Sequence, residues 1–415
     1  MHKRIFFITS CFLFLKGFGQ LPLSLRDCEE RFLQTNFTLL AEKYNIEATY
    51  AEAVQASLWE NPYFSMEGNA LNPQYHKAFS LQKDGQKAAT LQQLIYLGGK
   101  KKKEVQVANA AADVAELSFQ ELLQGLRYQL RTTYFSLYYD EQVSNVLDQQ
   151  LQHLDSLLQV YKQQVEKGNI PLKDLVRLQS MYLNLYNDRS LLRKAMIEAQ
   201  KTLKILVASD SVIMVQPLAE ELAHYNRILL QSESDLLVLA QSHQAGWLLA
   251  QKNKEAAERQ LQWQRSLAIP DLTVGLAYDQ NGGAFHNQVN LVLGMPLPIW
   301  NRNGGRIRAA SARVQEADYR KQSEAIRLKA DIHAAYAAYL LARADEQKIE
   351  QVLTSNADLV YQGVYENFSK RNITLMEFTD FLESYHNSQI QLRNVRKSLT
   401  QACEQLNYVT GSNLF

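Results

Sequence analysis

Proline, glycine and cysteine are scarce in this chain, and the first two gather at a few junctions. Its 415 residues contain eight prolines, 17 glycines and three cysteines. Because proline and glycine interrupt helices, their scarcity leaves stretches much longer than an ordinary globular helix. Neither the cysteines nor the eight scattered histidines form a metal-binding cluster, so no metal site is expected. Cys28 and Cys403 could pair if the chain ends adjoin, but buried free thiols are the favoured alternative.

Long apolar runs and an excess of one charge are also missing. After residue 19 no stretch of roughly 18 apolar residues occurs, so we expect no membrane-spanning helix. Lys and Arg number 44 against 43 Asp and Glu. This balance gives no bias towards nucleic acid and suits solvated helix faces. No phosphate-binding loop, nucleophile elbow or metalloprotease motif is present, so we expect neither an enzyme nor a cofactor.

The first 19 residues have the features of a secretory signal peptide. Basic residues are followed by an apolar run from Ile5 to Leu15 and by small residues at Gly17 and Gly19. We therefore expect cleavage after Gly19 and export of the mature chain. The segment ending at Cys11 resembles a lipidation site, but the apolar run continues beyond it, which favours a cysteine in a discarded signal.

The landmarks that punctuate the chain occur twice. Asn61-Pro62, Gly98-Gly99 and Lys167-Gly168-Asn169-Ile170 return as Ile269-Pro270, Gly304-Gly305 and Lys370-Arg371-Asn372-Ile373. The shift is roughly 202 to 208 residues, far longer than the period of a solenoid repeat. We interpret 20–206 and 233–415 as two copies of one module, joined by a connector at 207–232.

Each copy is predicted to contain a helix, a β-hairpin and a long helical hairpin. The first copy has its helix at 24–60, its β-hairpin at 62–97 and its helical hairpin at 99–206. The second has them at 233–267, 271–299 and 304–410. A helix over 100–166 would be about 100 Å long. Leu147, Leu151, Leu154 and Leu158 are spaced by four and three, as in a coiled-coil seam.

The predicted strands alternate between large apolar residues and polar or small ones. Each run has roughly 9 to 11 residues, enough for a tilted strand to cross an outer membrane, although a sheet on a soluble core alternates equally well. Aromatic residues near the strand ends, including Tyr96, Tyr278 and Trp300, favour the membrane. Four strands cannot close a membrane barrel, so several copies must contribute. The predicted lipid-facing residues are Phe64, Met66, Leu272, Val274, Leu276, Val289, Leu291 and Leu293.

In this order and spacing, the motifs resemble the TolC-like outer-membrane efflux channel family. The resemblance covers the mature sequence and rests on the duplicated plan and on Ile269-Pro270-Asp271-Leu272 and the run from Met295 to Gly305. It implies a mainly α fold with a small β part. Three copies would pool their strands in a 12-stranded outer-membrane β-barrel above a periplasmic α-helical tunnel of coiled-coil hairpins. It also implies a homotrimer in a Gram-negative bacterium, with a periplasmic adaptor protein and an inner-membrane efflux pump as partners.

The resemblance also assigns roles to the tips of the helical hairpins. Glu377 and Asp380 match the acidic residues at the family's narrowest periplasmic aperture, to which Asp174 of the first tip is added. Three-fold symmetry would gather these carboxylates into a cation-selective constriction. The alternative is that they are solvated charges on a helix face. The residues matched to adaptor docking are Gly168, Asn169, Leu172, Leu175, Arg177, Leu178, Ser180, Asn372 and Thr374.

The segments that flank the second β-hairpin look most like the heavy-metal branch of the family, the outer channels of cobalt, zinc, cadmium or copper exporters. We therefore expect a passive conduit for metal ions or small toxic molecules. The alternative function is a non-conducting periplasmic coiled-coil scaffold or adaptor, which would bury the apolar strand residues in protein. Lys100 to Lys103 stand at a helix start, against the helix dipole, which predicts an anion nearby. Lipid phosphate and a merely solvated run are both open alternatives there.

Overall fold

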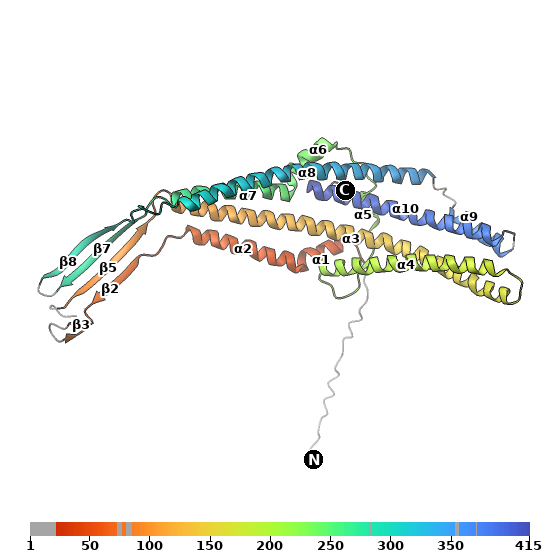
Figure 1. Ribbon diagram of the computed structural model, residues 1–415, viewed down its shortest axis with the longest axis horizontal. Helices are drawn as coiled ribbons and strands as arrows, with labels where there is room; N and C mark the ends of the chain where they lie inside the picture. The colour runs from red at the N-terminus through yellow and green to blue at the C-terminus, as the bar shows by residue number, and fades with distance from the viewer. Residues whose placement is uncertain (1–21, 73–76, 80–84, 282–283, 353–356, 371) are drawn as a thin grey trace, which may run out of the picture.

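The computed structural model describes residues 22–72, 77–79, 85–281, 284–352, 357–370 and 372–415. The predicted signal peptide and Cys11 lie outside these residues. The molecule is elongated, with a sheet at one end, the tips of two helical hairpins at the other, and the C-terminus near the middle (Figure 1). None of the described helices is both long and apolar enough to span a membrane.

The long helices have nearly the predicted bounds. In the first copy α3 (Lys100–Glu166) and α4 (Leu172–Leu206) form the helical hairpin. In the second copy α8 (Gly304–Val352) and α9 (Ala357–Ser369) are followed by α10 (Leu375–Thr410). The helix predicted over 304–369 is thus described as two helices, and residues 353–356 between them are outside the described part.

The helix that opens each copy was predicted to be continuous, and this prediction is wrong in both copies. The first is divided into α1 (Leu25–Thr35) and α2 (Phe37–Ser57), the second into α6 (Glu233–His243) and α7 (Ala245–Ser266). Asn36 caps α2 by accepting from the Leu39 amide at 3.1 Å, and its side-chain amide donates to the Leu206 carbonyl at 2.9 Å. Gln244 likewise caps α7. A polar side chain that caps a new helix can break one without proline or glycine.

Most of the buried side chains form one large core at the middle of the molecule. Leu130, Tyr134 and Phe135 of α3 lie at its centre and are fully buried. The connector contributes β6 (Met214–Val215), which pairs in parallel with β1 (Pro22–Leu23), and α5 (Ala219–His224). Cys28 and Cys403 belong to this core, are buried and are not joined in a disulfide, as the favoured alternative anticipated. Burial raises the pKa of the Cys28 thiol to about 12.

The sheet has four antiparallel strands in the order β2-β5-β7-β8. They are β2 (Tyr63–Gly68), β5 (Lys87–Ile95), β7 (Leu272–Asn281) and β8 (Phe285–Gly294), and the short strands β3 (Leu71–Asn72) and β4 (Lys77–Ala78) pair separately. The two β-hairpins of the two copies thus meet along β5 and β7. Strands β2 and β8 are the edges of the sheet, and neither has a second strand beside it within the described part of the chain.

The junction between sheet and helices is held by a buried ion pair. Lys100 is 5% exposed, and its Nζ lies 2.6 Å from Asp271 Oδ1, just before β7. The same oxygen accepts from the Leu97 amide at 3.0 Å. Beside it Gly98 has φ +68°, and a Cβ there would lie 2.5 Å from Ile269 Cδ1. The anion predicted near the four lysines is therefore a carboxylate of the second copy.

Candidate functional site: the sheet face and the hairpin tips

One face of the sheet carries a row of exposed apolar side chains across all four strands. Phe64 of β2 pairs with Leu91 of β5, which pairs with Leu276 of β7, which pairs with Leu291 of β8. Their exposed fractions lie between 50% and 66%. Side chains of this size and exposure are unusual on a surface that faces water when they form a continuous patch.

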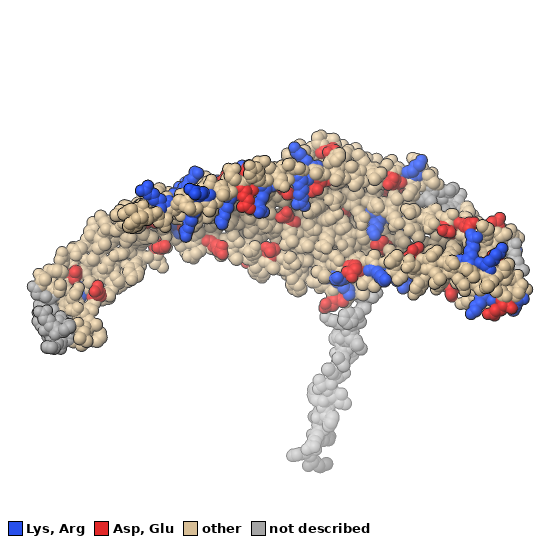
Figure 2. All heavy atoms as spheres, viewed as in Figure 1, with Lys and Arg blue, Asp and Glu red and all other residues tan. Residues whose placement is uncertain are grey.

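All eight residues predicted to face lipid lie on this same face. Met66 and Val289 form part of the next row, through Ala89 and Tyr278, and are also exposed. Leu272, Val274 and Leu293 continue the face towards the helices, because alternate residues of a strand share a face. Charged side chains are sparse over the sheet in comparison with the helical body (Figure 2).

The opposite face of the sheet is polar or small in two of its rows, and nearer the helices it also carries Tyr63, Leu94 and Val292. One row is Ser65, Thr90, Ala277 and Asn290, and the next is Glu67, Ala88, Asp279 and Gln288. Two contrasting faces agree with a sheet that separates an apolar environment from an aqueous one.

Aromatic side chains gather where the sheet meets the helices. The Trp59 and Tyr96 rings lie 5.9 Å apart, and Lys101 Nζ lies 5.6 Å from the centre of the Tyr96 ring. Trp300 is 92% exposed after β8. Rings with a polar edge suit the boundary of a membrane.

At the first hairpin tip the chain turns through Gly168, whose φ is +73°. The Gly168 and Asn169 amides donate to the carbonyls of Val165 and Gln164, each at 2.9 Å, and so close the end of α3. Leu172 is exposed, and Ser180 donates its hydroxyl to the Val176 carbonyl at 3.0 Å.

Two of the residues matched to docking, Leu175 and Leu178, point inward at this tip. They are 8% and 0% exposed, and Leu178 belongs to a small separate core with Leu154, Phe378 and Leu382. As side chains of the interior, they shape the turn rather than form its outer surface.

At the second tip Glu377 closes a capping box with Thr374, the N-cap of α10. The Glu377 carboxylate accepts from the Thr374 amide and from its hydroxyl, both at 2.8 Å. The Thr374 hydroxyl in turn accepts from the Glu377 amide at 3.2 Å. The hydrogen bond from the Thr374 amide, and then that from its hydroxyl, hold the pKa of Glu377 below its ordinary value. Thr-x-x-Glu before an apolar run is a known signature, so the sequence contained this signal.

Asp380 pairs across the two tips with Arg177. Its Oδ1 lies 2.6 Å from Arg177 Nη2, and both side chains are about half exposed. The structure thus joins a residue matched to docking with one matched to the aperture. Asp174 is half-buried in the first turn of α4. Burial of the Tyr161 hydroxyl, and then the negative charge of Asp174, raise the pKa of Tyr161.

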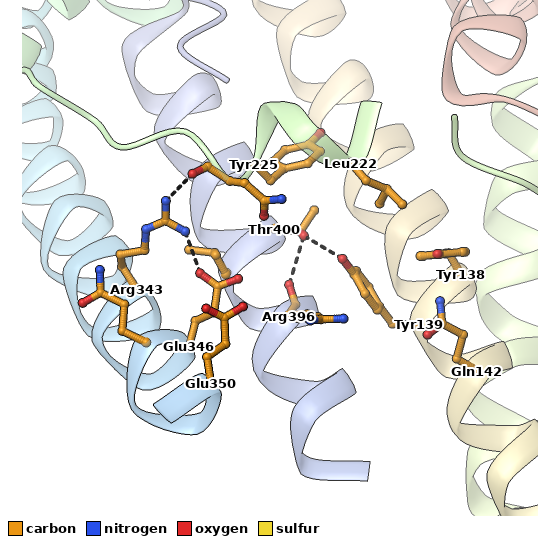
Figure 3. Close-up of a pocket in the computed structure, with 13 residues that line it drawn as sticks. Tyr138, Tyr139, Gln142, Leu222, Tyr225, Arg343, Glu346, Glu350, Arg396 and Thr400 are labelled. Carbon is orange, nitrogen blue, oxygen red and sulfur yellow. Dashed lines mark hydrogen bonds and ion pairs between the residues drawn. The ribbon is translucent and has the colours of Figure 1, made fainter. Parts of the chain in front are cut away.

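Sequence reasoning missed a polar cavity at the middle of the molecule. It measures about 570 Å³ and lies between α3, α5, α8 and α10 (Figure 3). Arg343 of α8 pairs there with Glu346 at 2.6 Å, and Thr400 donates to the Arg396 carbonyl at 3.0 Å. The residues that line the cavity come from both copies, so no local sequence motif predicts it.

The described residues contain no group of three or more His, Cys, Asp or Glu side chains placed to hold a metal ion. A conduit does not need to retain its cargo, so this finding leaves the predicted substrate class unchanged.

A small sheet with one exposed apolar face, carried on long helices of which α3 alone measures about 100 Å, is the arrangement expected of an outer-membrane channel that extends into the periplasm. The model of the family described as "Outer membrane efflux protein" matches residues 236–412. This match confirms, over those residues, the resemblance seen in the sequence.

One curated relative and two solved structures are similar to this chain over most of its length. The "Cobalt-zinc-cadmium resistance protein CzcC" of Cupriavidus metallidurans is 20% identical over 397 residues, which are 94% of this chain and 90% of that protein. Crystal structures of CusC have a TM-score of 0.74 at 14% identity, over 94% of this chain and 93% of that one. The outer membrane protein VceC of Vibrio cholerae has a TM-score of 0.70 at 17% identity, over 94% and 97%.

Proposed function

We propose that this protein is the outer-membrane channel of a tripartite efflux system, and that it passively conducts substrate from a periplasmic adaptor and inner-membrane pump to the exterior. The exposed apolar face of the sheet carries this proposal. In lipid every backbone amide needs a partner, yet β2 and β8 are open edges. Pairing of β8 of one copy with β2 of the next would close a barrel, and three copies would supply 12 strands.

Cell fractionation and electrophoresis test the assembly. We expect the mature protein in the outer-membrane fraction, as a trimer that needs detergent and dissociates on heating. The alternative function, a periplasmic scaffold, would leave Phe64, Leu276 and Leu291 facing water. A water-soluble monomer after signal cleavage would therefore overturn the proposed channel.

For the periplasmic end, the proposal assigns the aperture to Glu377, Asp380 and Asp174. Carboxylates from three subunits would favour cations in a narrow pore. Replacing Glu377 and Asp380 with Ala should lower the preference for cations in planar bilayers, whereas Glu366→Gln, on the exposed face of α9, should preserve it. Unaltered selectivity in the double variant would remove the aperture from the proposal.

Adaptor docking is proposed at the outer surface of the same tips. Gly168 and Asn169 shape the first turn, Leu172 is exposed beside it, and Asn372 and Thr374 are exposed at the second. Arg177 and Ser180 extend this surface along α4, while Leu175 and Leu178 support it from within.

Metal ions are the first substrate class to test, because the relative CzcC carries cobalt, zinc and cadmium in its name. Small toxic molecules are the second class. A strain that lacks the protein should become more sensitive to one class only, when it is compared across metal salts and amphiphilic drugs. Sensitivity to drugs without sensitivity to metals would reject the metal assignment and leave the channel itself intact.

A further inference from the structure

The tips of the hairpins have their own hydrophobic core, separate from the core at the middle. Leu154, Leu178, Phe378 and Leu382 form the tip core. Between the two cores, buried polar side chains, including Ser144 and Gln150 of α3 and His386 of α10, stand beside the buried Leu147 and Leu151 of α3. A tip joined to the body partly through polar contacts can separate without opening the large core, because the apolar contacts within that core would be kept.

Two of these polar side chains have no hydrogen-bond partner. Gln150 is 0% exposed and His386 is 7% exposed, and neither the two amide atoms of Gln150 nor the two ring nitrogens of His386 are bonded. Both side chains line a cavity of about 240 Å³ between α3, α4 and α10. A buried donor or acceptor that has left water without gaining a partner is destabilising. Separation of the tips would expose both side chains to water.

Several titratable or charged groups surround His386. His153 of α3 is hydrogen-bonded through Nδ1 to the Tyr361 hydroxyl of α9, at 2.8 Å. The Tyr361 and Tyr385 rings lie 6.1 Å and 5.3 Å from the His386 ring. Across the cavity are Arg177 and Asp188 of α4, and Glu383 precedes His386 by one turn of α10. Burial, and then the nearby His153, lower the pKa of His386 to about 4.

We propose that His386 couples separation of the two hairpin tips to the uptake of a proton, so that acid in the surrounding compartment favours the separated state. The packed tips favour a neutral His386, because the ring is largely buried and neither of its nitrogens has a hydrogen-bond partner. Separation returns the ring to water, where its pKa is near the ordinary value of 6.5. The stability of the packed state relative to the separated state is therefore unaffected above pH 6.5 and decreases as the pH falls towards 4. From pH 7 to pH 5 the separated population should rise by about twenty-fold per subunit.

As regulation of a channel this inference rests on the proposed function, but the movement itself is measured independently of conduction. Hydrogen exchange of the detergent-solubilised protein at pH 7 and pH 5, corrected for intrinsic rates, reports the separation. Protection of α10 at residues 375–390 should fall by about twenty-fold on acidification, while protection at 399–409, in the large core, should change little.

Two substitutions decide whether His386 is the group responsible. His386→Gln keeps a polar side chain that does not titrate, and it should reduce the pH effect at 375–390 to less than about two-fold. His333→Gln is the matched control, because the His333 side chain is 73% exposed and bonded to Glu233 on the body of the molecule. It should leave the effect intact.

A wild-type tip whose protection does not depend on pH would overturn the proposal, and so would a full pH effect in His386→Gln. If His386→Gln still forms the heat-dissociable trimer, the variant is folded. If the wild-type protein does not form this trimer, the result counts against the proposed channel and not against the role of His386.

Discussion

At the scale of single residues, the pair Lys100 and Asp271 fixes how the sheet meets the helices. Lys100 begins α3 and Asp271 precedes β7, so the pair joins the first copy to the second where the sheet meets the helices. Both side chains are largely buried, with exposed fractions of 6% and 20%. A buried charge that loses its partner is costly, because the remaining ion stays out of water.

Asp271→Asn should therefore destabilise the protein by about 3 to 5 kcal/mol, since it leaves the Lys100 ammonium without its counter-charge. The expected readout is a lower temperature for dissociation of the heat-modifiable trimer. Glu104→Gln is the matched control, because its pair with Lys101 at 3.1 Å is more exposed and should contribute less than about 1 kcal/mol. Equal effects of the two variants would show that burial of the first pair is unimportant.

Single residues also show what a sequence can and cannot reveal. The four lysines predicted a nearby anion from helix electrostatics, but not which one, because Asp271 is distant in the chain. Likewise Thr374 and Glu377 are three residues apart and form a readable capping box, whereas Arg177 and Asp380 are 203 residues apart. Contacts between residues close in the sequence can be predicted from local motifs, whereas contacts between the two hairpins depend on how the helices pack.

At the scale of the elements, helix ends at glycine and proline were predicted correctly, and the breaks at Asn36 and Gln244 were not. The end of α3 before Gly168 and the start of α4 after Pro171 follow from backbone geometry that these residues themselves impose. The break at Asn36 depends on the Leu206 carbonyl, which only the folded chain brings within 2.9 Å. At the sheet, period-two alternation was enough to place the eight apolar residues on one face, because register and period are coupled.

Adjacent residues of β8 provide a test of the two sheet faces. Leu291 lies on the apolar face and Asn290 on the polar face, and both are exposed. If the apolar face contacts lipid, Leu291→Arg should cost about 2 to 4 kcal/mol near the bilayer centre and sharply reduce trimer in the outer membrane. Asn290→Arg should assemble normally, because an aqueous lumen accepts the charge. Normal amounts of trimer for both variants would contradict contact with lipid.

At the scale of the whole molecule, the two copies share one large core at the middle while the tips have a small core of their own. The repeated order of elements accounts for the shared core, because α3 and α8, which occupy equivalent positions in that order, both pack against α10. The sequence indicated the duplication through its landmarks. It did not indicate the division into two cores, since the same leucine seam runs through α3 from one to the other.

Two phenylalanines of equal size test whether the cores behave independently. Phe135 is 0% exposed in the middle core, and Phe378 is 1% exposed in the tip core, where it stacks on Phe368 at 4.1 Å between ring centres. Truncation to Ala at either site should cost about 3 to 5 kcal/mol of local packing. Because the tip can open alone, Phe378→Ala should increase proteolysis near the tips and leave the main calorimetric transition within a few degrees of the wild type. Phe135→Ala should lower that transition and the yield of trimer. If Phe378→Ala instead lowered the main transition as much as Phe135→Ala, the tips and the middle would unfold as one cooperative unit, and proton-linked separation of the tips would lose its structural basis.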